Sequence, residues 1–256
     1  MDDGTNIWSK SIWVIRQNSE LFLAYCAVLP AIGILQEFFK QTSGNNFALV
    51  FTSVILAIPA HLSVLSNIRA FDAMRELQRK NPKYMIGFFF RTIALGVISV
   101  VPTFLLVVIL SGIGWGKNVV VSTTILALVL LSAIVFAKWG TMLPAVLMQN
   151  DKTFSKAGRR GNISFSYAFP RLILSFGLLT IVQLVVALIA AIVLGAGGDY
   201  FPATGGFDFA LLCTALLAAI IGGYQVIMTS VILSRAYLRA ENIGANQNDP
   251  VPIETM

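Results

Sequence analysis

Six uninterrupted runs of apolar residues constrain the fold of this chain more than any other feature. They occupy residues 21–39, 47–68, 86–111, 119–141, 169–195 and 208–234. A run of about 18 apolar residues is long enough to cross a bilayer as a helix. The runs do not alternate in polarity as a membrane β-strand does, so each segment has to satisfy its backbone hydrogen bonds internally. The sequence therefore predicts an all-α membrane protein with six transmembrane helices.

The composition agrees with this prediction and excludes an ordinary soluble domain. Apolar residues make up 57% of the 256 residues, and charged residues make up 12%. A soluble domain usually carries about 25% charged residues. The net charge of +6 does not indicate a nucleic-acid partner, because the basic residues lie in short segments between the apolar runs and form no separate basic domain.

The basic residues are concentrated in the connections on one side of the six runs. If the runs cross the membrane in turn, 16 of the 18 lysines and arginines share one side, and only Lys40 and Lys117 lie on the other. Short loops rich in lysine and arginine stay in the cytoplasm. We therefore expect a multi-pass protein with cytoplasmic N- and C-termini. An odd number of spans would destroy this segregation of charge.

The chain is expected to divide into three parts. Residues 1–18 are expected to form an amphipathic helix that lies in the membrane interface. Its apolar face carries Trp8, Ile12 and Ile15, and the opposite face carries Lys10 and Gln17. Residues 19–241 form the predicted six-span domain, and residues 242–256 are expected to be a flexible polar tail.

A weak internal repeat predicts that the spans are arranged as three helical hairpins in tandem. The three even-numbered spans are expected to run past the membrane into basic helical tails, which read SVLSNIRAFDAMRELQRK, AVLMQNDKTFSKAGRR and TSVILSRAYLRAE. Two odd-numbered spans begin alike, with FFFRTIALG from Phe88 and AFPRLILSF from Ala168. Repeats of this kind, with interrupted helices, often frame a site near the middle of the membrane in transporters.

Few residues in the apolar runs are candidates for chemistry. His61 is the only histidine and follows Pro59 in the second run, so it is a candidate polar site in the membrane, although packing beside a loosened turn accounts for it as well. One histidine cannot supply a bis-histidine haem site, and no cysteine or carboxylate partners lie near it in the sequence. Cys26 and Cys213 fall in apolar runs and are expected to act as small hydrophobic residues. We therefore expect no metal and no cofactor.

Four basic residues lie inside or at the edges of the apolar runs, and they are Arg91, Lys138, Arg171 and Arg235. A charge within the membrane is costly and often marks a functional site. These side chains are close enough to the cytoplasmic boundary to extend to it, and they are also candidates for a rim that binds anionic lipid headgroups. Lys138 would need a partner within the membrane if the fourth helix spanned 129–149.

The sequence does not predict an enzyme, and no catalytic residue is assigned. Asp72 and Glu76 lie one helical turn apart among arginines, which is typical of a solvent-exposed helix with paired charges. The chain contains no Walker A, GxSxG, HExxH or CxxCH motif. A membrane-embedded lipid enzyme would require His61, Lys138, Asp72 and Glu76 to converge within hydrogen-bond reach of one another.

The chain from the fourth run onward resembles the bacterial membrane-domain family that is fused to some glycerophosphodiester phosphodiesterases and also has stand-alone relatives. The matching segments are LPAV at 143–146, PRL at 170–172 and RAYLRAE at 235–241. Such proteins often carry Ser-Trp ahead of the fifth span, where this chain has GRRGN at 158–162. The phosphodiesterase catalytic domain has no counterpart in these residues. The resemblance therefore implies a helical protein of the bacterial inner membrane without hydrolase activity.

Two functions are compatible with these observations. The first is a non-catalytic inner-membrane protein, either an accessory or scaffold subunit of a membrane assembly or a lipid-organising protein. Its short loops, interfacial helix and basic face favour this function, with membrane lipids and other subunits or further copies of itself as partners. The alternative is a small transporter or channel-like protein built from the repeated hairpins. A polar cavity between the repeats would favour transport, and a solidly packed bundle would exclude it.

Overall fold

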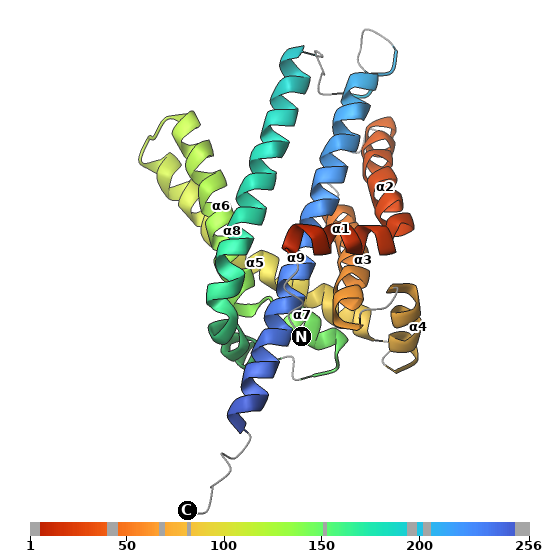
Figure 1. Ribbon diagram of the computed structural model, residues 1–256. Coiled ribbons are helices and arrows are strands. Elements are labelled where there is room, and N and C mark those ends of the chain that lie inside the picture. The colour runs from red at the N-terminus through yellow and green to blue at the C-terminus, as the bar shows by residue number, and fades with distance from the viewer. Residues whose placement is uncertain are drawn as a thin grey trace, which may run out of the picture.

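The computed structural model describes residues 6–39, 46–66, 70–80, 83–150, 153–193, 199–201 and 206–248. Within these ranges the regular structure is helical throughout, as the sequence predicts (Figure 1). The helices are α1 (Ile7–Gln17), α2 (Ser19–Phe38), α3 (Asn46–Ser66), α4 (Ala70–Lys80), α5 (Tyr84–Gly112), α6 (Lys117–Trp139), α7 (Met142–Leu147), α8 (Phe154–Val193) and α9 (Phe209–Asn248).

Five helical segments of the described residues are long and apolar enough to cross a membrane. They are Ser19–Phe38, Tyr84–Gly112, Lys117–Trp139, Phe154–Ile192 and Phe209–Asn242. The predicted second span corresponds to α3. Its apolar segment Val50–Ser66 is shorter than the 18 residues required of a span. The membrane character of the chain is therefore supported. The count of six spans and the side on which each terminus lies remain predictions.

Helices α8 and α9 continue well beyond the spans predicted for them. Each contains 40 residues. That length corresponds to about 60 Å of helix, roughly twice the hydrocarbon thickness of a bilayer. The predicted spans 169–195 and 208–234 cover only part of each helix. Part of the predicted tail 242–256 is also helical, because α9 continues to Asn248, and residues 249–256 lie outside the described ranges.

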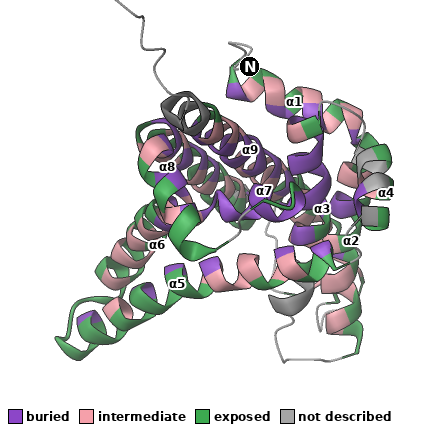
Figure 2. Ribbon diagram, turned by 90° about the horizontal axis from the view of Figure 1, so that it is seen from below, coloured by how far each residue is buried: buried purple, intermediate pink, exposed green. Residues whose placement is uncertain are grey.

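Burial divides the molecule into a membrane-facing half and a packed half. Large apolar side chains are exposed along α8 from Leu174 to Ile192 and along α9 from Phe209 to Ile220. The distal part of α5 and much of α6 are exposed in the same way (Figure 2). Toward their other ends, α5 and α9 pack against α3 and α7, and α8 packs against α6 and α9. All 6 residues of α7 are buried. Exposed apolar surface on this scale is typical of contact with lipid.

A single residue, Asn18, separates α1 from α2. Its Nδ2 donates hydrogen bonds to the carbonyl oxygen of Val14 and to Oγ of Ser63, both at 2.9 Å. The first bond closes the end of α1, and the second attaches the turn to α3. Asn18 therefore fixes the direction change between α1 and α2.

Helix α1 lies across α9, as Figure 1 shows. Trp8 stacks on Tyr224 with 5.9 Å between the ring centroids. The buried residues of α1 are Ile7, Ser11 and Val14. Ile12, which we expected on one apolar face with Trp8, is instead 46% exposed. The helix itself forms where the sequence predicts it, and Trp8 and Ile15 of the expected apolar face pack against the core.

The close contact between α6 and α8 depends on a glycine. A Cβ atom added to Gly161 would lie 2.0 Å from the carbonyl oxygen of Lys138. Beside it, Nζ of Lys138 donates a hydrogen bond to Oδ1 of Asn162. The GRRGN segment at 158–162 is therefore part of a helix–helix contact.

Candidate functional site

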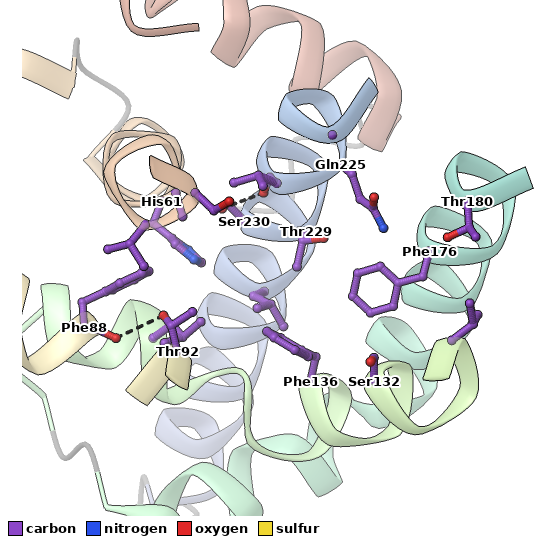
Figure 3. A pocket seen from close by; sticks show the side chains of 18 of the residues that line it. His61, Phe88, Thr92, Ser132, Phe136, Phe176, Thr180, Gln225, Thr229 and Ser230 are labelled. Carbon is purple, nitrogen blue, oxygen red and sulfur yellow. Dashed lines mark hydrogen bonds between the residues drawn. The ribbon is translucent and has the colours of Figure 1, made fainter. Parts of the chain in front are cut away.

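A cavity of about 360 Å³ lies between α3, α5, α6, α7, α8 and α9 (Figure 3). Its wall is mainly apolar. The polar residues that line it are Ser53, His61, Thr92, Ser132, Thr180, Gln225, Thr229 and Ser230. A concave, mainly apolar space of this size with a few converging polar groups is the usual form of a small-molecule site.

Helix α9 forms one wall of the cavity. The residues that it contributes are Gly222, Gln225, Val226, Thr229, Ser230 and Leu233. They follow one another at intervals of three or four residues, which places them on the same face of a helix. The position of this face is maintained by the uninterrupted backbone hydrogen bonding of α9, so the cavity wall is preformed.

The polar groups of the cavity fall into two classes. Ser230 Oγ donates to the carbonyl oxygen of Val226 at 2.9 Å, and Thr92 Oγ1 donates to that of Phe88 at 3.1 Å, so these hydroxyls are satisfied within their own helices. Neither Gln225 nor Thr229 forms a hydrogen bond through its side chain to any residue that the structure describes. Both side chains point from α9 into the cavity (Figure 3).

Gln225 is the most versatile of these groups. Its amide carries two N–H donors and an acceptor oxygen, and Thr229 one turn later adds a hydroxyl that both donates and accepts. On the opposite side of the cavity, Ser132 and Thr180 contribute two further hydroxyls. The arrangement can therefore bind an uncharged polar group such as a hydroxyl, a carbonyl or an ester.

His61 forms part of the wall on the side of α3. It is 1% exposed, and a 2.7 Å hydrogen bond joins its Nδ1 to Oγ of Ser234 on α9. Its ring packs against Phe88 at 5.5 Å between centroids, with an angle of 66° between the ring planes. The residue that we predicted as a polar intramembrane site thus links two helices beside the cavity, and Nε2 is its remaining polar atom.

The cavity is electrically neutral. Among the residues that the structure describes, no aspartate, glutamate, lysine or arginine lines it. Moving a charged group into mainly apolar surroundings without a partner is costly. The site therefore favours a neutral molecule, or the neutral part of a larger one.

A second cavity, also of about 360 Å³, lies between α2 and α3. Its lining is almost entirely apolar and includes Leu21, Val28, Ile32, Phe51 and Ile55. Phe51 and Ile55 are also exposed on the surface of the protein. This groove fits a hydrocarbon chain better than a polar group.

The four predicted rim residues come from four different helices, and none of them lines the first cavity. All four are half-buried. Arg91 Nη1 donates to the carbonyl oxygen of Gly87 at 2.9 Å, and Arg171 Nη1 donates to that of Tyr167 at 2.8 Å. Each guanidinium group therefore lies against its own helix, one turn before the residue that carries it.

Lys138 lies at the end of its helix and not in the middle. Helix α6 begins at Lys117 and ends at Trp139. The alternative position of the fourth helix at 129–149 is therefore wrong, because α6 and the separate helix α7 divide that range. The partner of Lys138 is Asn162, which the sequence did not identify.

The residues that a lipid enzyme would require are not gathered at the cavity. His61 lines it, but Lys138 and Asp72 do not, and Asp72 is exposed on α4. The side chain of Glu76 lies outside the described part of the structure. Within the described residues, no group of three or more histidine, cysteine, aspartate or glutamate side chains is placed to hold a metal ion.

Sequence reasoning missed Gln225 and Thr229. A signal was present, since Gly222, Gln225, Thr229 and Ser230 form a polar stripe at helical spacing within an apolar span. The resemblance to the phosphodiesterase-associated membrane family stays a prediction. No protein-family model, no curated protein and no solved structure matches this chain.

Proposed function

We propose that the chain is a non-catalytic, multi-pass protein of the bacterial cytoplasmic membrane that binds a neutral, mainly apolar molecule, such as an uncharged lipid, between its helices. The observation that carries the proposal is the pair Gln225 and Thr229. Their polar groups point into a mainly apolar cavity and form no hydrogen bond to a described residue. Polar groups in such surroundings are costly unless they are hydrogen-bonded. A bound molecule with a hydroxyl or carbonyl group supplies the missing bonds.

The position of the cavity supports a ligand that comes from the membrane. The exposed apolar side chains of α9 end at Ile220, and the cavity lining of that helix begins at Gly222. On α8, the lining residues Phe176 and Thr180 lie within the segment that exposes apolar side chains to the outside. A molecule dissolved in lipid therefore reaches the cavity without crossing water.

The proposal includes six spans arranged as three hairpins, α2–α3, α5–α6 and α8–α9, with both termini in the cytoplasm. It also places α1 at the cytoplasmic interface. In support of this placement, α1 carries two tryptophans, Trp8 and Trp13, and two basic residues, Lys10 and Arg16. In addition, Nζ of Lys10 lies 3.7 Å from the centre of the Trp13 ring. Tryptophan and lysine are enriched where helices meet the headgroup layer.

Retention of the bound molecule tests this function. The full-length protein is purified in lipid nanodiscs, and co-purifying molecules are identified by native mass spectrometry. The double variant Gln225→Leu/Thr229→Val removes both unpaired groups and is expected to lower retention of one neutral species by about tenfold. The matched control Gln183→Leu/Thr214→Val makes the same changes outside the cavity lining and is expected to retain it. Equal retention by both double variants contradicts the proposal.

A second function, transport of the same molecule, is favoured by one observation. The cavity is lined by residues from each of the three proposed hairpins. A single cysteine at Thr229, in a protein with Cys26 and Cys213 replaced by alanine, reports access to the cavity. Labelling by a membrane-impermeant thiol reagent from both sides of the membrane supports transport. Labelling from one side only, or none, supports binding without transport.

A further inference from the structure

Outside the cavity, two arginines converge on one tyrosine where α8 and α9 meet. The guanidinium carbons of Arg171 and Arg239 lie 4.1 Å and 5.3 Å from the centre of the Tyr167 ring. Arg171 also donates to the backbone carbonyl of Tyr167, which holds it in place. Tyr167 is 7% exposed, whereas Arg239 is exposed. Both cationic groups therefore contact the same buried ring.

Among the residues that the structure describes, no acid neutralises the positive charge of this pair. Glu241 follows Arg239 closely in α9, but its carboxylate accepts a 2.6 Å hydrogen bond from Arg160. Over the described residues, neither Arg171 nor Arg239 forms an ion pair. Two neighbouring cations repel each other, and an anion placed between them is attracted to both. Guanidinium groups bind phosphate oxygens through paired N–H donors, which makes phosphate the best fit.

The depth of the pair indicates the source of the phosphate. Apart from Phe154 at its start, the large exposed apolar side chains of α8 run from Leu174 to Ile192. That stretch is about 27 Å of helix, close to the hydrocarbon thickness of a bilayer. Arg171 lies one turn beyond Leu174, so it lies at the level of the lipid headgroups and not among the acyl chains.

We propose that Arg171 and Arg239, held by Tyr167, bind the phosphate of an anionic membrane lipid. Of the four rim residues expected from the sequence, this site contains only Arg171. Its second arginine, Arg239, was not among those four. It is independent of the neutral cavity, because none of the three residues lines that space.

Binding is measured on the full-length protein in nanodiscs of phosphatidylcholine with or without phosphatidylglycerol, by native mass spectrometry of the retained lipid. Arg171→Gln/Arg239→Gln is expected to lower retention of phosphatidylglycerol by about tenfold. Arg159→Gln, which removes an exposed arginine elsewhere on α8, is expected to behave like the unaltered protein. If the double variant retains the lipid as the unaltered protein does, the proposal is overturned.

Two further measurements separate phosphate recognition from a general effect of charge, and a lipid phosphate from a soluble one. Arg171→Lys/Arg239→Lys keeps both charges but loses the paired donors, and it is expected to retain more lipid than the glutamine variant. If the double glutamine variant does not fold, Arg239→Gln alone changes only an exposed side chain, and unchanged retention in it overturns the proposal.

Inorganic phosphate is tested in phosphatidylcholine nanodiscs, where the proposal expects no increase in thermal stability. Stabilisation equal to that given by phosphatidylglycerol would identify a site for soluble anions and overturn the lipid assignment.

Discussion

Replacing Gly161 by alanine tests the close contact between α6 and α8. The added Cβ would lie 2.0 Å from the carbonyl oxygen of Lys138 and 2.6 Å from its carbonyl carbon. Both atoms belong to the backbone, so they cannot rotate away as a side chain does. Helix α8 therefore has to move away from α6, which weakens the hydrogen bond of Lys138 to Asn162 and the 3.3 Å bond from Thr141 to the backbone of Ala157.

The expected cost follows from two opposing effects. Overpacking at a rigid contact usually costs about 1–3 kcal/mol, and a contact with backbone lies at the upper end of that range. The higher helix propensity of alanine offsets up to about 1 kcal/mol of this loss of stability. We therefore expect the free energy of unfolding of Gly161→Ala to fall by about 2 kcal/mol, which corresponds to a Tm lower by roughly 6 °C.

Thermal unfolding of the purified protein in detergent measures this shift. The matched control is Gly177→Ala in the same helix, because no atom lies within 4 Å of the added Cβ. The control is expected to be as stable as the unaltered protein or slightly more stable, since only helix propensity changes. If Gly161→Ala is as stable as Gly177→Ala, the contact between α6 and α8 is not as close as described.

Two other substitutions test contacts of the segment before α9 and of the cavity wall. The Glu37 carboxylate accepts a 2.6 Å hydrogen bond from the backbone N–H of Tyr200, and burial together with this carboxylate raises the pKa of the Tyr200 phenol. Glu37→Gln is expected to lower that pKa towards its usual value, measured by ultraviolet titration, and an unchanged pKa would contradict this contact. Ser234→Ala leaves Nδ1 of His61 without its partner and is expected to cost about 1–3 kcal/mol in thermal unfolding. Ser230→Ala, which removes only a bond within α9, should cost less.

The helical membrane architecture could be predicted because the apolar runs are long and continuous, a property of local sequence alone. The ends of α8 and α9 could not be predicted in the same way. The parts of these helices beyond the apolar runs are covered by other helices, so small and polar residues such as Ser164 and Ala240 are buried there. Hydropathy therefore indicates which segments contact lipid, but it does not indicate which segments contact other helices.

The candidate site could be predicted only in part. His61 was recognisable because a histidine in an apolar run is unusual. Gln225 and Thr229 gain their significance from the cavity that α3, α6 and α8 form around them, and this packing depends on contacts between distant segments. For the same reason, the convergence of Arg171 and Arg239 on Tyr167 could not be read from their positions in the sequence.

The most direct test of the proposed function asks whether the cavity holds a distinct molecule. A photo-crosslinking analogue of phenylalanine is introduced at Phe176, which lines the cavity, and separately at Leu188, which is exposed on the same helix. After irradiation in native membranes, the adducts are identified by mass spectrometry. We expect one neutral species at Phe176 and a mixture of bulk phospholipids at Leu188. The same mixture at both positions, or no adduct at Phe176, would contradict a binding site between the helices.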